Sequence, residues 1–426
     1  IMFKALISGA LLTLVPLVSA ADELNSGDTA WMLTSSALVL FMLLPGLSLF
    51  YGGLVRSKNA LSVVMQCFAI GCVASVIWFV IGYSLAFSDG GSMNWFIGGT
   101  SQAFLSGVSF DSMSGTIPES VFIVFQMTFV MITPALFVGG FAERIRFGGM
   151  LLFTILWIFA VYLPLCHWVW GGGWLSDLGL MDFAGGTVVH ITAGVTALVA
   201  AVVVGSRKGF PKSAMAPHNL TLTVAGAGML WFGWFGFNAG SALVSDGSAG
   251  MTMLVTHLAA ACGSLTWMAI EWIKHGKPSV LGIVTGMVAG LGTVTPASGY
   301  IGPIGGVALG VVGGVVCYFA TQFIKNGLKL DDSLDVFPVH GVGGAMGTLL
   351  AAVFGAAAYG GVGLDQSISG QLGVQAIGVL AAATYTAVVS YILFKIVGAI
   401  TPLRVDEEEE HQGLDIVCHD ERGYNF

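Results

Sequence analysis

Long apolar stretches separated by short polar segments dominate the chain. Each stretch is long enough to cross about 30 Å of hydrocarbon as a helix, whereas a membrane barrel would show ten-residue segments of alternating polarity. Glycines and occasional prolines within the stretches suit close helix packing in lipid. We predict an all-α integral membrane protein with eleven spanning helices, at 31–55, 60–87, 119–142, 149–166, 186–206, 218–240, 252–274, 279–298, 301–324, 336–356 and 372–400.

The cations test this count, because after the first twenty residues only every second loop between predicted helices carries lysine or arginine. In chain order, with the last helix and the tail, they are Arg56, Lys58, Arg144, Arg146, Arg207, Lys208, Lys212, Lys274, Lys277, Lys325, Lys329, Lys395, Arg404 and Arg422. All of them fall on one side, which the positive-inside rule makes the cytoplasm. A miscounted helix would break the alternation. We expect a periplasmic N-terminus and a cytoplasmic C-terminus.

Composition excludes several other classes of protein. Hydrophobic residues make up 56% of the 426 residues and charged residues only 9%, against about 25% charged residues in a soluble domain. The net charge of −8 excludes a generally basic nucleic-acid-binding surface. The six cysteines form no CxxC pair, so neither a disulfide framework nor a zinc site is indicated. We expect no cofactor and no metal.

The first twenty residues have the pattern of a secretory signal peptide. Lys4 precedes an apolar run over 5–18, and small residues lead to Ala20. We predict cleavage near Ala20, with a retained helix as the alternative. The mature chain then has two parts, a transmembrane domain at 21–400 and a cytoplasmic tail at 401–426.

Five helices in each half, with opposite orientations, are typical of inverted repeats. The first repeat covers about 31–206 and the second about 218–356, which leaves 372–400 as an extra brace. The fifth helix of each repeat carries one histidine, at His190 and His340.

Three ionisable residues lie within or at the edge of the predicted helices, where such groups are costly and mark pathways or partners. Asp182 opens the fifth helix and is interpreted mainly as an N-cap, with direct substrate contact as the alternative. Inverted symmetry would bring His190 and His340 together as a pore-lining pair. Burial favours neutral imidazoles, which each offer one donor and one acceptor. Two histidines alone fall short of a metal site.

Aromatic residues gather at the outer side of the predicted bundle. Aromatic residues collect at membrane interfaces in any case, so a simple interface belt is one interpretation. Their common depth favours an aromatic vestibule that binds a small cation through ring faces. The residues concerned are Phe125, Phe129, Trp170, Trp234 and Phe237, followed by Ser241.

The segment from Asp182 to Arg207, DFAGGTVVHITAGVTALVAAVVVGSR, resembles the signature of the ammonium transporter family (Amt/Mep/Rh), and of its bacterial Amt branch in particular. Six further phrases occur in the family's order: FYGGLVRSKN, GGFAERIRF, HWVWGGGWL, WFGFNAGSAL, VTPASGYIG and DVFPVHGVGG. The resemblance covers essentially the whole chain after the leader.

The resemblance implies a role for each candidate residue, and it also implies a homotrimer with one pore per subunit. Trp170, Ser241 and Phe125 correspond to the family's outer recruitment site. Asp182 matches the aspartate required near that site. The remaining positions are the stacked gate at Phe129 and Phe237, the twin histidines His190 and His340, and the lumen tryptophan Trp234.

Physical reasoning and the resemblance agree on the mechanism. Ammonium would be captured by cation–π contacts and one hydrogen bond, and it can donate protons where potassium cannot. A narrow apolar pore makes a charged ion expensive to move. Ammonium would therefore be deprotonated, and ammonia would pass the gate and the histidines. We favour net electrogenic movement with the histidines as the proton relay.

The tail after Pro402 is acidic, which by composition alone indicates a solvated segment. Its spacing R-V-x-x-E…G-L-D, with Arg404, Gly413, Leu414 and Asp415, resembles the regulatory tail of Amt proteins. The resemblance implies communication between subunits and binding of a PII-type signal protein at the cytoplasmic face.

The leading hypothesis is an ammonium transporter of the cell inner membrane, with methylammonium as a substrate analogue. An electroneutral Rh-type channel for ammonia or carbon dioxide is one alternative. An ammonium sensor that signals through a partner protein is another. An enzyme is not indicated, since the sequence contains no HExxH or GxSxG motif.

Overall fold

The computed structural model describes residues 23–425, so the predicted signal peptide at 1–20 lies outside the described residues. Helices dominate, and several are interrupted by a π-helical turn, labelled η. In the first half the elements are α1 (Ser26–Phe41), η1 (Met42–Leu47), α2 (Ser48–Leu54), α3 (Ala60–Ile77), η3 (Trp78–Gly82), α4 (Tyr83–Phe87), β1 (Met113–Ser114), β2 (Ile117–Pro118), α5 (Glu119–Phe141), α6 (Phe147–Trp157), η6 (Ile158–Tyr162), α7 (Leu163–Trp170), α8 (Trp174–Asp177), η7 (Gly186–Ile191) and α9 (Thr192–Val204).

The second half repeats this helical organisation without strands among its described residues. Its elements are α10 (Leu220–Ala239), α11 (Gly247–His275), α12 (Val280–Val294), α13 (Pro303–Gln322), η9 (Phe323–Gly327), η10 (Phe337–Val342), α14 (Gly343–Phe354), α15 (Ile368–Ile400), α16 (Glu407–Gln412) and α17 (Leu414–His419). Short 3₁₀ turns lie at Ser57–Asn59, Gly91–Met93, Ala103–Leu105, Gly240–Ala242 and Ala357–Tyr359.

Ten helices in the described part of the chain are long and apolar enough to cross a membrane. They coincide with ten of the eleven predicted spans, with ends that differ by a few residues, apart from the fourth, which runs on to Asp177. The eleventh, predicted at 279–298, is the shorter helix α12 of 15 residues. It ends before Pro296, which has no backbone N–H to continue the helical hydrogen bonds.

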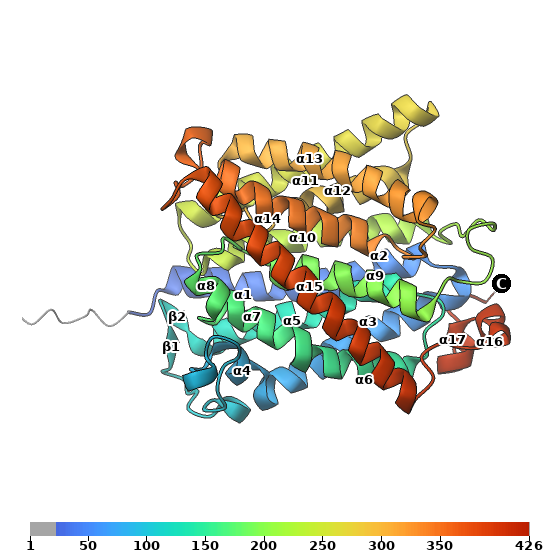
Figure 1. The fold of residues 1–426 in the computed structure, drawn as a ribbon, viewed down its shortest axis with the longest axis horizontal. Coiled ribbons are helices and arrows are strands. Elements are labelled where there is room, and N and C mark those ends of the chain that lie inside the picture. The colour runs from blue at the N-terminus through green and yellow to red at the C-terminus, as the bar shows by residue number, and fades with distance from the viewer. Residues whose placement is uncertain (1–22, 426) are drawn as a thin grey trace, which may run out of the picture.

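The spanning helices lie side by side in one bundle, and α15 crosses the face of that bundle obliquely (Figure 1). α15 packs against α6, α9 and α14, so it contacts helices of both repeats. The small hairpin of β1 and β2 lies at one end of the bundle, and the tail helices α16 and α17 lie at the other (Figure 1).

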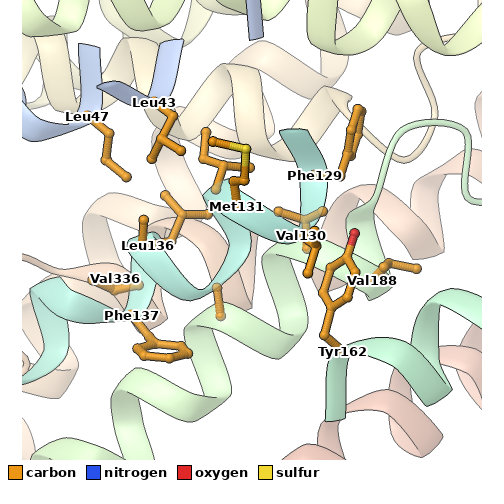
Figure 2. Close-up of a cluster of buried hydrophobic side chains, with 14 of the residues drawn as sticks. Leu43, Leu47, Phe129, Val130, Met131, Leu136, Phe137, Tyr162, Val188 and Val336 are labelled. Atoms are coloured by element: carbon orange, nitrogen blue, oxygen red, sulfur yellow. The ribbon is translucent and has the colours of Figure 1, made fainter. Parts of the chain in front are cut away.

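α5 is the most enclosed of the spanning helices. In its most apolar window 89% of the residues are buried, and Figure 2 shows α5 side chains such as Val130, Leu136 and Phe137 packed among residues of neighbouring elements. Phe129 projects from this same helix. The aromatic residues of α5 are therefore held by a surrounding shell of apolar contacts.

Glycines let the two histidine-bearing helices approach each other closely. A Cβ added at Gly194 of α9 would lie 2.3 Å from the backbone nitrogen of Gly341, and one at Gly344 would lie 2.7 Å from the Cβ of His190. Only a hydrogen side chain fits such contacts between backbones. These glycines set the distance between the fifth helices of the two repeats.

The charged loops and the tail meet at one end of the bundle. Arg207 pairs with Asp331 at 2.8 Å and lies 3.7 Å from Glu143, which also pairs with Arg56. Burial alone would raise the pKa of Asp331, but the hydrogen bonds and charge of Arg207 bring that pKa below its ordinary value. Loops far apart in the sequence are thus joined by ion pairs, as the one-sided distribution of cations requires.

Replacing Gly194 with valine tests the close approach of the two histidine-bearing helices. Overpacking of this kind costs about 1–3 kcal/mol, so we expect a clearly lower thermal unfolding midpoint for the purified protein in detergent. Gly228→Ala is the control, because nothing lies within 4 Å of a Cβ at that position. Equal midpoints for the two variants would contradict the packing argument.

Candidate functional site

An aromatic cavity of about 310 Å³, predicted to face outward, opens beside the N-terminal part of α5 and the C-terminal end of α7. Phe125 and Phe129 come from α5, Trp170 ends α7, and Ser241 lies in the turn that follows α10. The Ser241 hydroxyl donates to the Phe237 carbonyl at 2.9 Å, so its oxygen lone pairs remain able to accept a hydrogen bond. The cavity brings together the residues predicted as the recruitment site.

Phe129 lines this cavity and stacks on Phe237, which lies behind it. The Phe129 and Phe237 ring centroids are 4.3 Å apart with an interplanar angle of 24°. Phe129 also meets Phe125 and Trp170 edge-on, at centroid distances of 5.0 and 5.7 Å. Both rings of the stack are buried, at 1% and 0% exposure. In this conformation the stack separates the cavity from the interior.

Asp182 acts through its hydrogen bonds to the start of the next helix. Its carboxylate accepts backbone N–H groups from Gly185, Gly186 and Thr187 at 2.9, 2.6 and 2.8 Å, and it also accepts the Thr187 hydroxyl. Gly185 has φ +113°, which favours glycine. The carboxylate therefore satisfies free N–H groups at the start of the helix that carries His190, although the N-cap residue of that helix is Gly185 and not the predicted Asp182.

The backbone of Asp182 also holds Trp170. The indole Nε1 of Trp170 donates to the Asp182 carbonyl at 2.9 Å. One residue thus orients both a ring of the outer cavity and the helix of the first histidine.

His190 and His340 lie next to each other beneath the stacked rings. Their Nδ1 atoms are 3.2 Å apart, and the ring planes differ by 24°. One Nδ1 must donate and the other accept. Trp234 stacks on His190 at 5.6 Å, and its Nε1 donates to Thr295 at 2.9 Å. The buried Nε2 of His190 makes no hydrogen bond within the described part of the chain.

The space beside the histidines is narrow and mostly apolar. Its volume of about 10 Å³ is close to the minimum for one water molecule. Apart from the two histidines, its lining consists of apolar and aromatic side chains, among them Phe237, Trp234 and Ile132. Across residues 23–425 no three metal-binding side chains cluster.

A wider cavity of about 120 Å³ continues on the other side of His340. His340, Phe50 and Val288 line both this inner cavity and the narrow space. Lys325 and Asp335 lie at its wall and form an ion pair at 2.8 Å. The cavities and the stacked rings between them follow one another through the bundle.

Asp332 is a candidate that the sequence analysis missed. It lies eight residues before His340, just as Asp182 lies eight residues before His190, and this repeated spacing is the signal that would have found it. Its Oδ2 accepts the Phe337 N–H at 2.7 Å at the start of η10. Burial and the neighbouring charge of Asp335 raise the pKa of Asp332 to about 7.

The tail residues lie at the charged end of the bundle, away from the aromatic cavity. The Asp415 carboxylate accepts the N–H groups of Leu61 and Ser62 at 3.1 and 2.7 Å, at the start of α3. The Leu414 N–H donates to Asn59 at 2.8 Å.

Two further tail positions fix its path. Arg404 pairs with Glu410 at 2.8 Å. Gly413 has φ +106°, and a Cβ there would lie 2.7 Å from the Lys58 carbonyl oxygen. The tail is thus docked on the loop between the first two spans.

A bundle of membrane-spanning helices with successive cavities through its interior is the architecture of a membrane transport protein. The model of the Ammonium Transporter Family matches residues 30–424, and the chain belongs to this family.

Named relatives agree with this family. The chain is similar to an ammonium transporter of Bacillus subtilis, at 45% identity over 94% of this chain and 99% of the relative. An ammonium transporter of Aquifex aeolicus is 44% identical over 98% of each chain. Among solved structures, Mep2 of Saccharomyces cerevisiae has a TM-score of 0.80 at 38% identity and covers 90% of this chain and 91% of its own. A structure titled "Sensor Amt Protein" has a TM-score of 0.85 at 32% identity, with 92% and 98% covered.

Replacing Asp332 with asparagine tests its raised pKa. In the folded protein the Asp332 carboxyl keeps its proton up to about pH 7. In the unfolded chain it loses that proton at about pH 4. The contribution of Asp332 to stability therefore falls as the pH rises between these values. Asparagine does not titrate but can still accept the Phe337 N–H. We expect the unfolding midpoint of Asp332→Asn, relative to the unmodified protein, to rise from about pH 4 to about pH 7 and to level off above that pH.

The neighbouring Asp331→Asn is the matched control. The Asp331 pKa is lowered, so the stability it contributes is present above its unfolded pKa and is lost as the pH falls. Asp331→Asn should be destabilised throughout that range without the trend of Asp332→Asn. A flat difference for Asp332→Asn would show that its pKa is ordinary.

Proposed function

We propose that the protein recruits ammonium at the outer aromatic cavity, deprotonates it and conducts ammonia past His190 and His340, with net electrogenic movement of the proton. The observation that carries this proposal is the order of the parts. A cavity suited to a cation leads to a closed ring stack, and a narrow apolar space with a histidine pair follows.

The outer cavity is suited to capture a small cation that donates hydrogen bonds. Ring faces attract a cation by roughly 0.5–2 kcal/mol each, and Phe125 and Trp170 line the cavity. The Ser241 oxygen has lone pairs free to accept from an N–H group. Potassium has the charge of ammonium but no proton to donate, so the hydrogen bond favours ammonium.

The region below Phe129 and Phe237 favours a neutral solute. A charged ion loses its hydration there and finds mainly apolar walls. Ammonia is neutral and can still hydrogen-bond to a histidine nitrogen. Opening of the ring stack after deprotonation would admit it.

The histidine pair supplies a path for the proton. The two Nδ1 atoms share one hydrogen bond, so a proton arriving at one ring can be passed on at the other. The proton that ammonium loses would be accepted by the Nε2 of His190, which has no hydrogen-bond partner among the described residues. The Nδ1 proton of His190 would pass to His340 at the same time, so one positive charge moves with each ammonia.

The tail supports a regulatory proposal. Its docking on the first loop and its ion pairs with other loops suit communication at the cytoplasmic face, and we place the protein in the inner membrane with this end inside. We propose a homotrimer whose cytoplasmic face binds a PII-type signal protein. The likeness to a structure titled as a sensor also makes signalling a second candidate role.

Trp170→Leu tests the recruitment site. The substitution removes one ring face from the cavity, so we expect half-maximal methylammonium uptake to need about fivefold or more of the solute, the ratio that corresponds to loss of a single cation–π contact. Uptake is measured in cells and normalised to the transporter present in the membrane. Exposed Trp272 lies on α11 outside the cavity, and Trp272→Leu is the control. Unchanged uptake and ion selectivity in Trp170→Leu would contradict the site.

His340→Ala tests the proton path. Purified protein on a solid-supported membrane is given ammonium and potassium pulses. We expect an ammonium current for the unmodified protein, little current with potassium, and about tenfold or greater loss of the ammonium current in the variant because the relay is broken. Ammonium-dependent pH change inside liposomes without any current would instead indicate an electroneutral channel.

A further inference from the structure

The side-chain amide of Gln375, on α15, is fully buried and hydrogen-bonds to the loop that leads to the aromatic cavity. Its Oε1 accepts the N–H of Met181 at 2.9 Å, and its Nε2 donates to the Met181 carbonyl at 2.7 Å. One side chain therefore holds the donor and the acceptor of the same backbone residue.

The same amide ties this loop to the second repeat. The Nε2 of Gln375 also donates to the carbonyl of Thr348 at 2.8 Å, and Thr348 lies on α14, the helix that continues from His340. Gln371, one turn earlier on α15, donates to Gln375 Oε1 and to the Gly179 carbonyl at 3.1 and 3.0 Å. Two glutamines thus join α15, α14 and the loop.

Met181, whose backbone Gln375 hydrogen-bonds, directly precedes Asp182. Residues 180–185 form no helix or strand, so their backbone has no ladder of its own to set its orientation. Two hydrogen bonds to Met181 hold the peptide planes on either side of it, including the one that joins Met181 to Asp182, and so limit where Asp182 can lie. The Phe183 N–H donates to the Pro296 carbonyl at 3.0 Å and shares the next peptide plane with the Asp182 carbonyl. That carbonyl, of Asp182, receives the indole N–H of Trp170.

We propose that Gln375 is a positioning residue for the recruitment site, acting through Met181 and Asp182 on the ring of Trp170. This inference rests on the proposed function of the outer cavity. It assigns a functional task to α15, which lies outside the two repeats.

Gln375→Met tests the proposal, because methionine has nearly the same size but cannot hydrogen-bond to Met181. Ammonium currents are measured on solid-supported membranes over a range of concentrations. We expect the half-saturating concentration to rise about fivefold, the ratio that corresponds to one lost net hydrogen bond, while the maximal current per transporter stays within about twofold, because the histidine pair is not touched.

Ser390→Ala is the matched control on the same helix. Ser390 is also buried and hydrogen-bonds with Trp157 and Thr196 at 3.1 and 3.2 Å, but it lies about four turns from Gln375. The Ser390→Ala substitution weakens the packing of α15 but leaves the hydrogen bonds to Met181 intact. The half-saturating ammonium concentration of this variant should therefore equal that of the unmodified protein. Equal shifts in Ser390→Ala and Gln375→Met would overturn the proposal in favour of general loosening.

Gln375→Glu provides a second readout that does not depend on helix docking. The carboxylate can accept the Met181 N–H but repels the two carbonyls, whereas the protonated carboxyl regains one donor. The half-saturating concentration, relative to the unmodified protein, should therefore fall as the pH is lowered. A half-saturating concentration for Gln375→Glu equal to that of the unmodified protein at every pH would count against a role for the hydrogen bonds of Gln375.

The double variant with Trp170→Leu separates failure of this inference from failure of the proposed function. Trp170→Leu alone must raise the half-saturating concentration if the cavity recruits ammonium. Given that rise, adding Gln375→Met should have little further effect, because both changes act through one ring. A rise for Trp170→Leu without one for Gln375→Met overturns the inference alone, and no rise for Trp170→Leu overturns the recruitment site itself.

Discussion

A polar group inside hydrocarbon must find its partner within the protein, and this constraint shapes the whole structure. The backbone satisfies it by forming helices. Where the helix stops, before η7, the Asp182 carboxylate accepts three free N–H groups, and Gln375 satisfies the backbone of Met181. The same constraint acts on a solute, because an ion that cannot replace its hydration shell is excluded.

Much of the fold could be predicted because lipid demands a simple pattern. Apolar length alone located ten spans that the described residues confirm. The alternating cations supported an eleventh, where the structure has the shorter apolar helix α12 of 15 residues. The hydrogen bonding of Asp182 to the start of a helix followed from its place before that helix. Local sequence did not reveal the π-helical turns at η7 and η10, since they depend on how the helices pack.

Contacts between distant segments were harder to predict. His190 and His340 could be suspected as a pair from symmetry, but their 3.2 Å separation depends on glycines such as Gly194 that permit the helices to approach. Asp332 was missed because the residues before His340 were not compared with those before His190, where Asp182 has the same eight-residue spacing. The role of Gln375 could not be predicted from the sequence, because nothing near this glutamine indicates which distant loop it hydrogen-bonds to.

Two inverted repeats by themselves would give a pore whose two entrances have the same structure. α15 has no counterpart in the repeats, and its Gln375 side chain hydrogen-bonds to the loop beside the aromatic cavity and to α14. The capping carboxylates differ in the same sense, because Asp182 has three backbone donors whereas an oxygen of Asp332 has no partner. The carboxylate before His190 therefore has more of its hydrogen-bonding capacity satisfied than the carboxylate before His340. A single additional helix thus makes the two ends of a pseudo-symmetric molecule chemically different.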